Sequence, residues 1–180
     1  FNIEGNPFEE KCGDYPGLMA LVEETNPDQC TLVPDSNDQL TSDHGFDLYA
    51  DRERLIPVIK RIQSKGVRVS LFMDPDLEQI EQAAQMGTDR IELYTGPYAS
   101  AWGAPDFEQI FRKYRAAAEL AQTLGLGVNA GHDLNLKNLS YFCTIDNILE
   151  VSIGHAFTVD SLDLGLARTV EAYRSELSKG

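Results

Sequence analysis

The sequence predicts an α/β fold, a (β/α)8 TIM barrel represented by about six βα units within one domain, residues 1–180. Short apolar runs typical of buried parallel strands alternate with amphipathic stretches typical of helices, at about 30 residues per unit. Polar residues stand inside or just after several of these runs. An open doubly wound sheet usually carries a glycine-rich phosphate turn after its first strand, and the Gly-Asn-Pro cluster at residues 5–7 is not one.

The first two strands are short and clearly bounded. Residues 2–4 form the first predicted strand, which the Gly-Asn-Pro cluster breaks. An apolar stripe with helical spacing follows at residues 15–25, and Pro16 suits the start of that helix. The second strand, at residues 29–33, is stopped by a Pro-Asp pair.

A polar loop at residues 35–47 separates the second strand from an amphipathic helix. The apolar residues of this helix lie between Leu55 and Ile62, and the Lys-Gly pair at residues 65–66 ends it. Residues 67–73 begin with alternating apolar and polar residues, and the first apolar ones are β-branched valines, a pattern that predicts a strand. An Asp-Pro pair then opens a helix over residues 74–87, and a glycine ends it.

The last three units repeat the order of strand and helix. The predicted elements are a strand at 89–94, a long loop at 95–105, an alanine-rich helix at 107–124, a strand at 126–129, a short helix at 136–143, a strand at 148–153 and a closing helix at 161–177. A barrel needs eight units, and the chain begins inside a predicted strand without methionine. We therefore expect two N-terminal βα units to be lacking and the chain alone to be inactive.

Two glutamates interrupt predicted strands. Glu4 and Glu92 each have aliphatic neighbours in the strand, and successive strand residues point to opposite faces. Aliphatic side chains suit the face that packs against helices, where a carboxylate would cost several kcal/mol to bury. Both glutamates are therefore predicted to face the barrel lumen, and a solvent-exposed position at the strand edge is the alternative.

Two Gly-His pairs follow predicted strands. Gly131-His132 makes His132 a candidate acid or base, although a structural hydrogen-bonding histidine is the alternative. Gly154-His155 precedes the last predicted helix, where barrels commonly hold a phosphate, and a simple turn is its alternative. His44 lies among polar residues of the 35–47 loop, which reads equally well as a polar turn or as a lid over a ligand.

Composition narrows the possible partners. The net charge of −14 argues against nucleic acid and anionic membrane surfaces as partners. The spacing of histidines and carboxylates does not predict a metal site, and the three cysteines are expected to be reduced thiols. The sequence has no apolar run of about 20 residues and no signal peptide at its start. A cytoplasmic location is therefore expected.

Seven longer stretches can be compared with known families. They are Phe1–Glu4 (FNIE), Leu32–Pro34 (LVP), Thr41–Asp47 (TSDHGFD), Val69–Asp74 (VSLFMD), Ile91–Ala99 (IELYTGPYA), Gly125–His132 (GLGVNAGH) and Ile153–Ala156 (IGHA). In these stretches the chain resembles the pyridoxine 5′-phosphate synthases of the bacterial vitamin B6 pathway. The resemblance implies a TIM barrel with extra helices, assembled as a homo-octamer. It also implies a transferase that condenses two small phosphorylated substrates, 1-deoxy-D-xylulose 5-phosphate and 3-amino-2-oxopropyl phosphate, into pyridoxine 5′-phosphate without cofactor or metal.

The resemblance also implies roles for individual residues. Glu4 matches a proton-accepting glutamate, His132 the proton-donating histidine, and Glu92 a glutamate that stabilises the transition state. The matched substrate-binding positions are Ser42, Asp133, Gly154 and His155. Ser42 stands where the family commonly has threonine and keeps the hydroxyl, whereas Asp133 stands where some members have glycine.

Some family residues have no counterpart in this chain. A second catalytic histidine and the asparagine and arginine substrate ligands belong to the family's N-terminal part. Two other interpretations stay open at this point. One is another phosphate-binding barrel enzyme, such as an aldolase or a sugar-phosphate isomerase, and the other is an inactive fragment.

Overall fold

The structure is a computed structural model that describes residues 1–36 and 38–180. Its elements, in chain order, are β1 (Asn2–Gly5), α1 (Leu18–Thr25), β2 (Gln29–Leu32), α2 (Leu48–Gln63), β3 (Arg68–Met73), α3 (Leu77–Met86), β4 (Arg90–Tyr94), α4 (Gly96–Ser100), α5 (Phe107–Thr123), β5 (Gly127–Gly131), α6 (Leu139–Phe142), β6 (Ile148–Ser152), α7 (His155–Leu164) and α8 (Leu166–Leu177).

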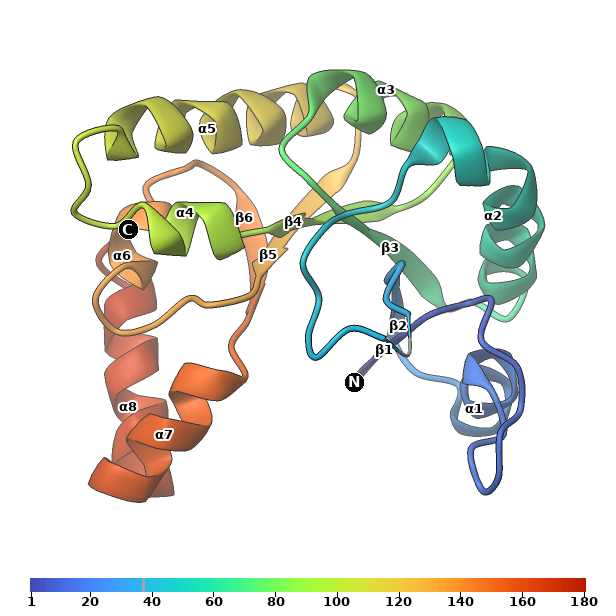
Figure 1. Cartoon of the computed structure of the whole chain (residues 1–180), viewed down its shortest axis with the longest axis horizontal. Coiled ribbons are helices and arrows are strands. Elements are labelled where there is room, and N and C mark those ends of the chain that lie inside the picture. The colour runs from blue at the N-terminus through green and yellow to red at the C-terminus, as the bar shows by residue number, and fades with distance from the viewer. Residues whose placement is uncertain (37) are drawn as a thin grey trace.

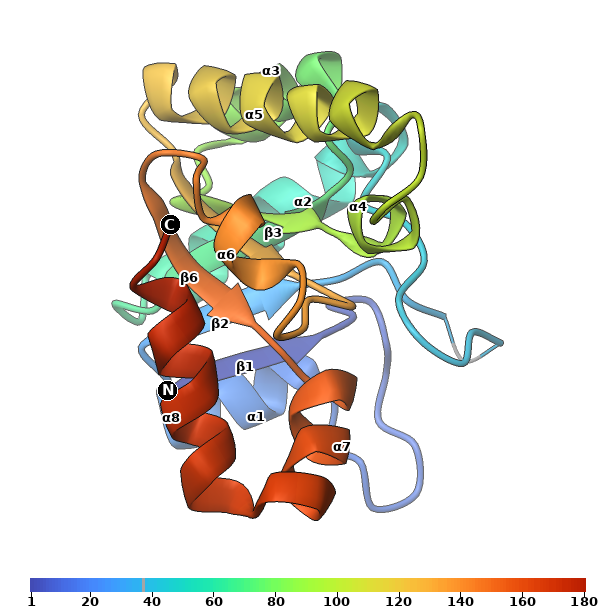
Figure 2. The same ribbon diagram turned by 90° about the vertical axis from the view of Figure 1, so that its left-hand side faces the viewer.

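The six strands form one parallel sheet in the order β1-β2-β3-β4-β5-β6. The sheet curls, and α1, α2, α3 and α5 lie along its outer side (Figure 1). Helices α7 and α8 pack against each other beyond β6, as the turned view shows (Figure 2). The curled sheet is part of a TIM barrel, which confirms the predicted fold class.

Alternation along the strands separates the helix-packing face from the lumen. On β3, the side chains of Val69, Leu71 and Met73 are fully buried in the core under the helices. Ser70 lies between them in the chain and therefore points to the opposite, lumenal face. Each fully buried aliphatic side chain contributes about 1.5–3 kcal/mol to folding, so this pattern fixes which face is inside.

Helix α2 begins earlier than its apolar pattern predicts. The carboxylate of Asp47 accepts hydrogen bonds from the backbone amides of Tyr49 and Ala50, at 3.1 and 3.4 Å, and so caps the helix. The first turns lie outside the predicted range because the charged residues 51–54 separate the buried Leu48 from the apolar stripe that begins at Leu55. Pro57 lies within the helix, four residues after Glu53.

Two predictions about loops and helices were wrong. The predicted loop at 95–105 contains the short helix α4, which has Pro97 near its start. The predicted closing helix at 161–177 is two helices, because Gly165 adopts a φ of 82° between α7 and α8. Gly154-His155 consequently stands at the start of the penultimate helix.

The three cysteines are free thiols: Cys12 is exposed, Cys30 is buried and Cys143 is half-buried. Burial raises the pKa of Cys30 to about 12, which keeps this thiol protonated at neutral pH. Within residues 1–36 and 38–180, no helix has the length and apolar character needed to cross a bilayer.

Candidate active site

A pocket of about 580 Å³ opens at the carboxyl ends of the strands. It is lined by Glu4, Val33, Thr41, Ser42, Phe72, Glu92, His132, Asp133, Ser152, Ile153, Gly154, His155, Thr158 and Val159. The seven residues that the resemblance matches to functional positions are therefore brought together, although they come from segments spread over the whole chain. The pocket lies where barrel enzymes carry out their chemistry.

Glu92 is buried inside the lumen, with 2% of its surface exposed. Burial is the main reason that its pKa is raised to about 8, and the nearby charge of Glu4 adds to the effect. Hydrogen bonds from Ser152 and Thr31 act in the opposite direction. The Glu92 carboxyl therefore carries a proton at neutral pH, a state in which it can donate a hydrogen bond.

Glu4 lies on β1, an edge strand of the sheet; it lines the same pocket and keeps an exposed surface. Surrounding protein atoms nevertheless remove water from its carboxylate. Desolvation raises the pKa of Glu4, followed by the charge of Glu150, while a hydrogen bond from Asn2 lowers it. The pocket thus contains two carboxyl groups in different surroundings, the arrangement that separates an acid from a base.

Gly131 makes room for the Glu92 carboxylate. A β-carbon built on Gly131 would overlap Oε1 of Glu92, so no larger residue fits at this position without moving that side chain. Thr95, just after β4, holds the same point of β5: its backbone amide donates to the carbonyl of Gly131 at 2.8 Å, and its hydroxyl at 2.6 Å. Packing against Glu92 therefore explains why the first Gly-His pair has glycine at position 131.

His132 is turned into the pocket by an unusual backbone. Its φ is 90°, and that of Asp133 is 58°, both in the left-handed region that side chains disfavour. Nε2 of His132 lies 2.8 Å from Oγ1 of Thr41, and the ring packs edge-on against Tyr94. Nδ1 lies 3.2 Å from an Asp133 oxygen without hydrogen-bond geometry. The imidazole is thus held at one nitrogen, while the other faces a carboxylate.

Only part of the 35–47 loop reaches the pocket, and residue 37 of that loop lies outside the described residues. Thr41 and Ser42 line the pocket, and the Ser42 hydroxyl donates to Asp35 at 2.5 Å. His44 instead pairs with the adjacent Asp43 on the exposed side, at 2.5 Å. The loop therefore contacts the site through hydroxyl groups, and His44 is not among the lining residues.

Gly154 and His155 begin helix α7 at the pocket wall. No side chain caps this helix start, so the backbone amides of its first turn are available to an anion. A β-carbon on Gly154 would meet no atom within 4 Å, so packing does not require glycine here. The residues lining the pocket include no lysine or arginine.

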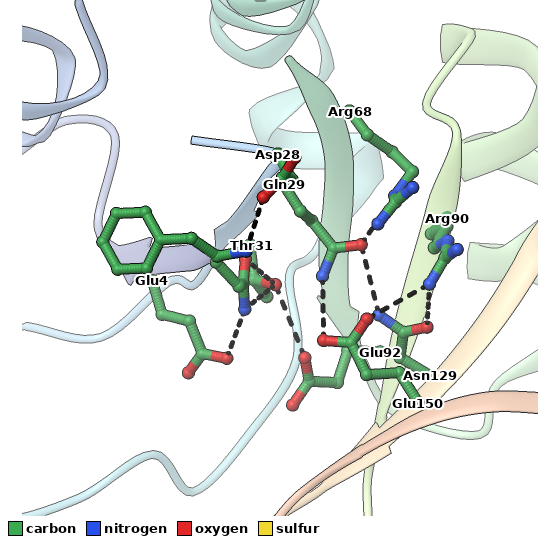
Figure 3. Close-up of polar contacts among 11 residues, drawn as sticks. Glu4, Asp28, Gln29, Thr31, Arg68, Arg90, Glu92, Asn129 and Glu150 are labelled. Carbon is green, nitrogen blue, oxygen red and sulfur yellow. Dashed lines mark hydrogen bonds and ion pairs between the residues drawn. The ribbon is translucent and has the colours of Figure 1, made fainter. Parts of the chain in front are cut away.

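The sequence interpretation missed three residues that contact the glutamates: Asn2, Thr31 and Ser152. Asn2 donates hydrogen bonds to Glu4 and to Thr31, and the Thr31 hydroxyl lies within hydrogen-bond distance of Glu92. Figure 3 shows Thr31 between the two glutamates. Strand alternation could have found them, because Asn2 shares a face with Glu4, and Thr31 is paired with Glu4 across the sheet. The pairing of Thr31 with Glu4, however, depends on the register between β1 and β2, which the sequence alone does not give.

A second polar layer lies deeper in the lumen, toward the amino ends of the strands. Nη1 of Arg90 donates to Asn129 at 2.9 Å and approaches Glu150 at 3.3 Å, while Arg68 donates to Gln29 at 2.9 Å (Figure 3). This layer supplies partners for polar groups that would be costly to bury alone. Among the described residues, no group of three or more His, Cys, Asp or Glu is arranged to hold a metal ion.

The fold and the pocket define an (β/α)-barrel protein with two carboxyl groups and a histidine at the carboxyl ends of its strands. Two solved structures share the fold. The Amycolatopsis orientalis BexX/CysO complex matches with a TM-score of 0.55 at 16% identity, over 89% of this chain and 60% of that chain. The tryptophan synthase A-subunit of Pyrococcus furiosus matches with a TM-score of 0.54 at 12% identity, over 89% and 58%.

Sequence relatives identify the particular family. The family described as pyridoxal phosphate biosynthesis protein PdxJ matches residues 1–179, and the chain belongs to it. A pyridoxine 5′-phosphate synthase of Xylella fastidiosa (strain 9a5c) is 51% identical over 174 residues, which cover 96% of this chain and 67% of the relative. One of Xanthomonas axonopodis pv. citri is 49% identical over 181 residues, covering 100% and 71%. The chain thus spans about two thirds of the length of these relatives.

Proposed function

We propose that this chain carries the active-site chemistry of a pyridoxine 5′-phosphate synthase, which condenses 1-deoxy-D-xylulose 5-phosphate with 3-amino-2-oxopropyl phosphate. The observation that carries the proposal is the pocket shared by Glu4, Glu92 and His132. Relatives with this name, at about half identity over nearly the whole chain, support it. Imine formation, phosphate elimination, hydration and ring closure all move protons, which such a group of side chains can exchange.

Glu4 is the proposed base. Its carboxylate accepts a hydrogen bond from Asn2 and stays open to the pocket, so it can take a proton from a bound substrate. Glu92, protonated at neutral pH, donates a hydrogen bond to developing negative charge in the transition state. His132 is the proposed acid, since Thr41 holds its Nε2 edge at the pocket wall.

The proposed phosphate site is the start of α7. The free backbone amides beside Gly154 and His155 supply partial positive charge without lysine or arginine, which suits a chain of net charge −14. Ser42 and Asp133 also line the pocket and are the proposed contacts of the remainder of the substrate. Holding two substrates in a fixed orientation supplies a further large part of the rate enhancement.

A turnover experiment with two proteins tests the proposal. One is the 180-residue chain, and the other is a chimera in which the preceding segment of the Xylella fastidiosa relative is joined ahead of Phe1. Pyridoxine 5′-phosphate and inorganic phosphate are measured after adding both substrates. We expect product from the chimera and none from the chain alone, whose lumen is open between β1 and β6. A folded chimera without product would contradict the proposed function.

An aldolase that works through a Schiff base is the competing function. Such an enzyme needs a lysine in the pocket, and none of the lining residues is lysine. Borohydride reduction with either substrate, followed by mass spectrometry, separates the two functions. We expect no covalent adduct on a lysine of the chimera, and a trapped lysine at this pocket would favour the aldolase.

A further inference from the structure

The two carboxyl groups of the pocket are joined by a short chain of hydrogen bonds that runs through Asn2 and Thr31. Nδ2 of Asn2 donates to Oε1 of Glu4 at 2.9 Å and to the Thr31 hydroxyl at 3.2 Å. The Thr31 hydroxyl lies 3.3 Å from Oδ1 of Asn2 and 3.5 Å from Oε2 of Glu92. The chain therefore reaches from β1 through β2 to β4 (Figure 3).

The two ends of this chain are chemically unequal. An amide N–H can only donate, so the Asn2 contact favours the ionised form of Glu4 and not its acid form. The Thr31 hydroxyl has a single proton, so it can donate to either Asn2 or Glu92 at one time. The carboxyl of Glu92 is far more buried than that of Glu4, which favours its neutral form.

We propose that Asn2, held in place by Thr31, is a positioning residue that keeps Glu4 as the ionised member of the pair while Glu92 keeps the proton. The catalytic meaning of this division rests on the proposed function, because a base must be ionised before it can accept a proton. Without the Asn2 contact, the two carboxyl groups would compete for one proton on more equal terms.

Thr31 can hold Asn2 in place because its side chain is buried and because of its position in the pairing of β1 with β2. Its side chain is fully buried and is paired with Glu4 across β1 and β2, directly beside Asn2 in the lumen. It touches Asn2 but makes no hydrogen bond to Glu4 among the described contacts. Loss of the Thr31 hydroxyl therefore affects Glu4 only through the orientation of Asn2, which is the property that the experiment tests.

Other charged groups also act on the pair and must be kept constant. Glu150 of β6 and Asp35 after β2 raise the pKa of Glu4, and Glu150 also raises that of Glu92. Arg90 pairs with Glu150, and the pocket wall contains His132, Asp133 and His155. The variants below leave all of these residues in place.

The experiment is a pH titration of the glutamate carboxyl carbons by NMR in the 180-residue chain labelled with 13C-glutamate. Glu4→Gln and Glu92→Gln assign the two signals. The test variants are Asn2→Leu and Thr31→Val, which remove the hydrogen bonds at nearly constant volume. We expect both to raise the pKa of Glu4 by about half a unit to one unit, the worth of one such hydrogen bond.

Two controls separate positioning from general disturbance of the lumen. Thr31→Ser keeps the hydroxyl and should keep the wild-type titration of Glu4. Ser70→Ala removes another fully buried lumenal hydroxyl, paired with Thr31 across β2 and β3 but without a hydrogen-bond partner, and should also leave Glu4 unchanged.

An unchanged Glu4 titration in folded Asn2→Leu or folded Thr31→Val would overturn the proposal. The two variants lie on different strands, so either one decides the matter if the other fails to fold. The titration needs no turnover: a chimera without product would remove the proposed function, whereas the titration would still report whether Asn2 and Thr31 control Glu4.

Discussion

The carboxyl group of Glu92 occupies the space that a side chain on Gly131 would need. Glu92 lies on β4 and Gly131 on the neighbouring strand β5. Their contact places the buried carboxyl group next to the backbone segment that turns His132 into the pocket. The position of the Glu92 side chain thus depends on the absence of a side chain at Gly131, the residue before His132.

Gly131→Ala should destabilise the protein and displace Glu92. The added methyl group overlaps the carboxylate oxygen, and such overpacking typically costs about 1–3 kcal/mol. Urea denaturation measures the loss. Gly154→Ala is the matched control for stability, since its methyl group would meet no atom within 4 Å, and it should unfold at nearly the wild-type urea concentration. Equal stability of the two variants would show that Glu92 is not held against Gly131.

Raising the pH should weaken the folded state through Glu92. The pKa of this group is raised from 4.5 to about 8, so the folded protein binds more protons than the unfolded chain between these values. The stabilisation is complete below about pH 4.5 and is lost as the pH rises through about 8. Urea denaturation from pH 5 to 8.5 should give a free energy of unfolding that falls by about 1 kcal/mol or more.

The side-chain amide of Glu92→Gln does not ionise, so this variant should show a flatter dependence of stability on pH over the same range. Glu10→Gln, at an exposed position, is the control and should follow the wild type. A wild-type slope that persists in Glu92→Gln would mean that another group titrates.

Replacement of Asp133 by glycine should stabilise the chain. Asp133 has a φ of 58°, which costs a residue with a side chain about 1 kcal/mol and costs glycine little. Asp133→Ala keeps the backbone strain and removes the carboxylate, so it separates the two effects. We expect Asp133→Gly to be more stable than Asp133→Ala by about 1 kcal/mol in urea denaturation. The reverse order would contradict a strained backbone at this position.

His132→Asn should lower turnover of the active chimera by roughly 10²-fold or more, the usual contribution of one general acid or base. Asparagine keeps a polar group near the Thr41 hydroxyl and tolerates the left-handed backbone, so folding should be preserved. Circular dichroism checks the fold beside the kinetic assay. Near-normal turnover would leave His132 with a structural function only.

Phosphate should bind to the backbone at the start of α7. His155 is the first residue of this helix, where proline is well tolerated but has no N–H to offer. In calorimetry with inorganic phosphate, His155→Ala should keep most of the affinity, and His155→Pro should lose it. Loss in both variants would assign the contact to the imidazole, and loss in neither would place the phosphate elsewhere.

The local pattern of the sequence determined the class of fold and much of the pocket. Strand alternation was enough to orient Glu4 and Glu92 toward the lumen, because aliphatic neighbours must face the helices. The glycines before His132 and His155 marked two strand ends that face the pocket. These inferences succeed because each depends on residues a few positions apart.

Only the tertiary structure decided how these groups act on one another. The overlap of Gly131 with Glu92, and the link from Asn2 through Thr31, join strands far apart in the chain. The raised pKa of Glu92 likewise results from burial, which residues of several strands produce together. Local periodicity shows which way a side chain points, whereas its partners are set by the register and curvature of the sheet, and these depend on the whole chain packing at once.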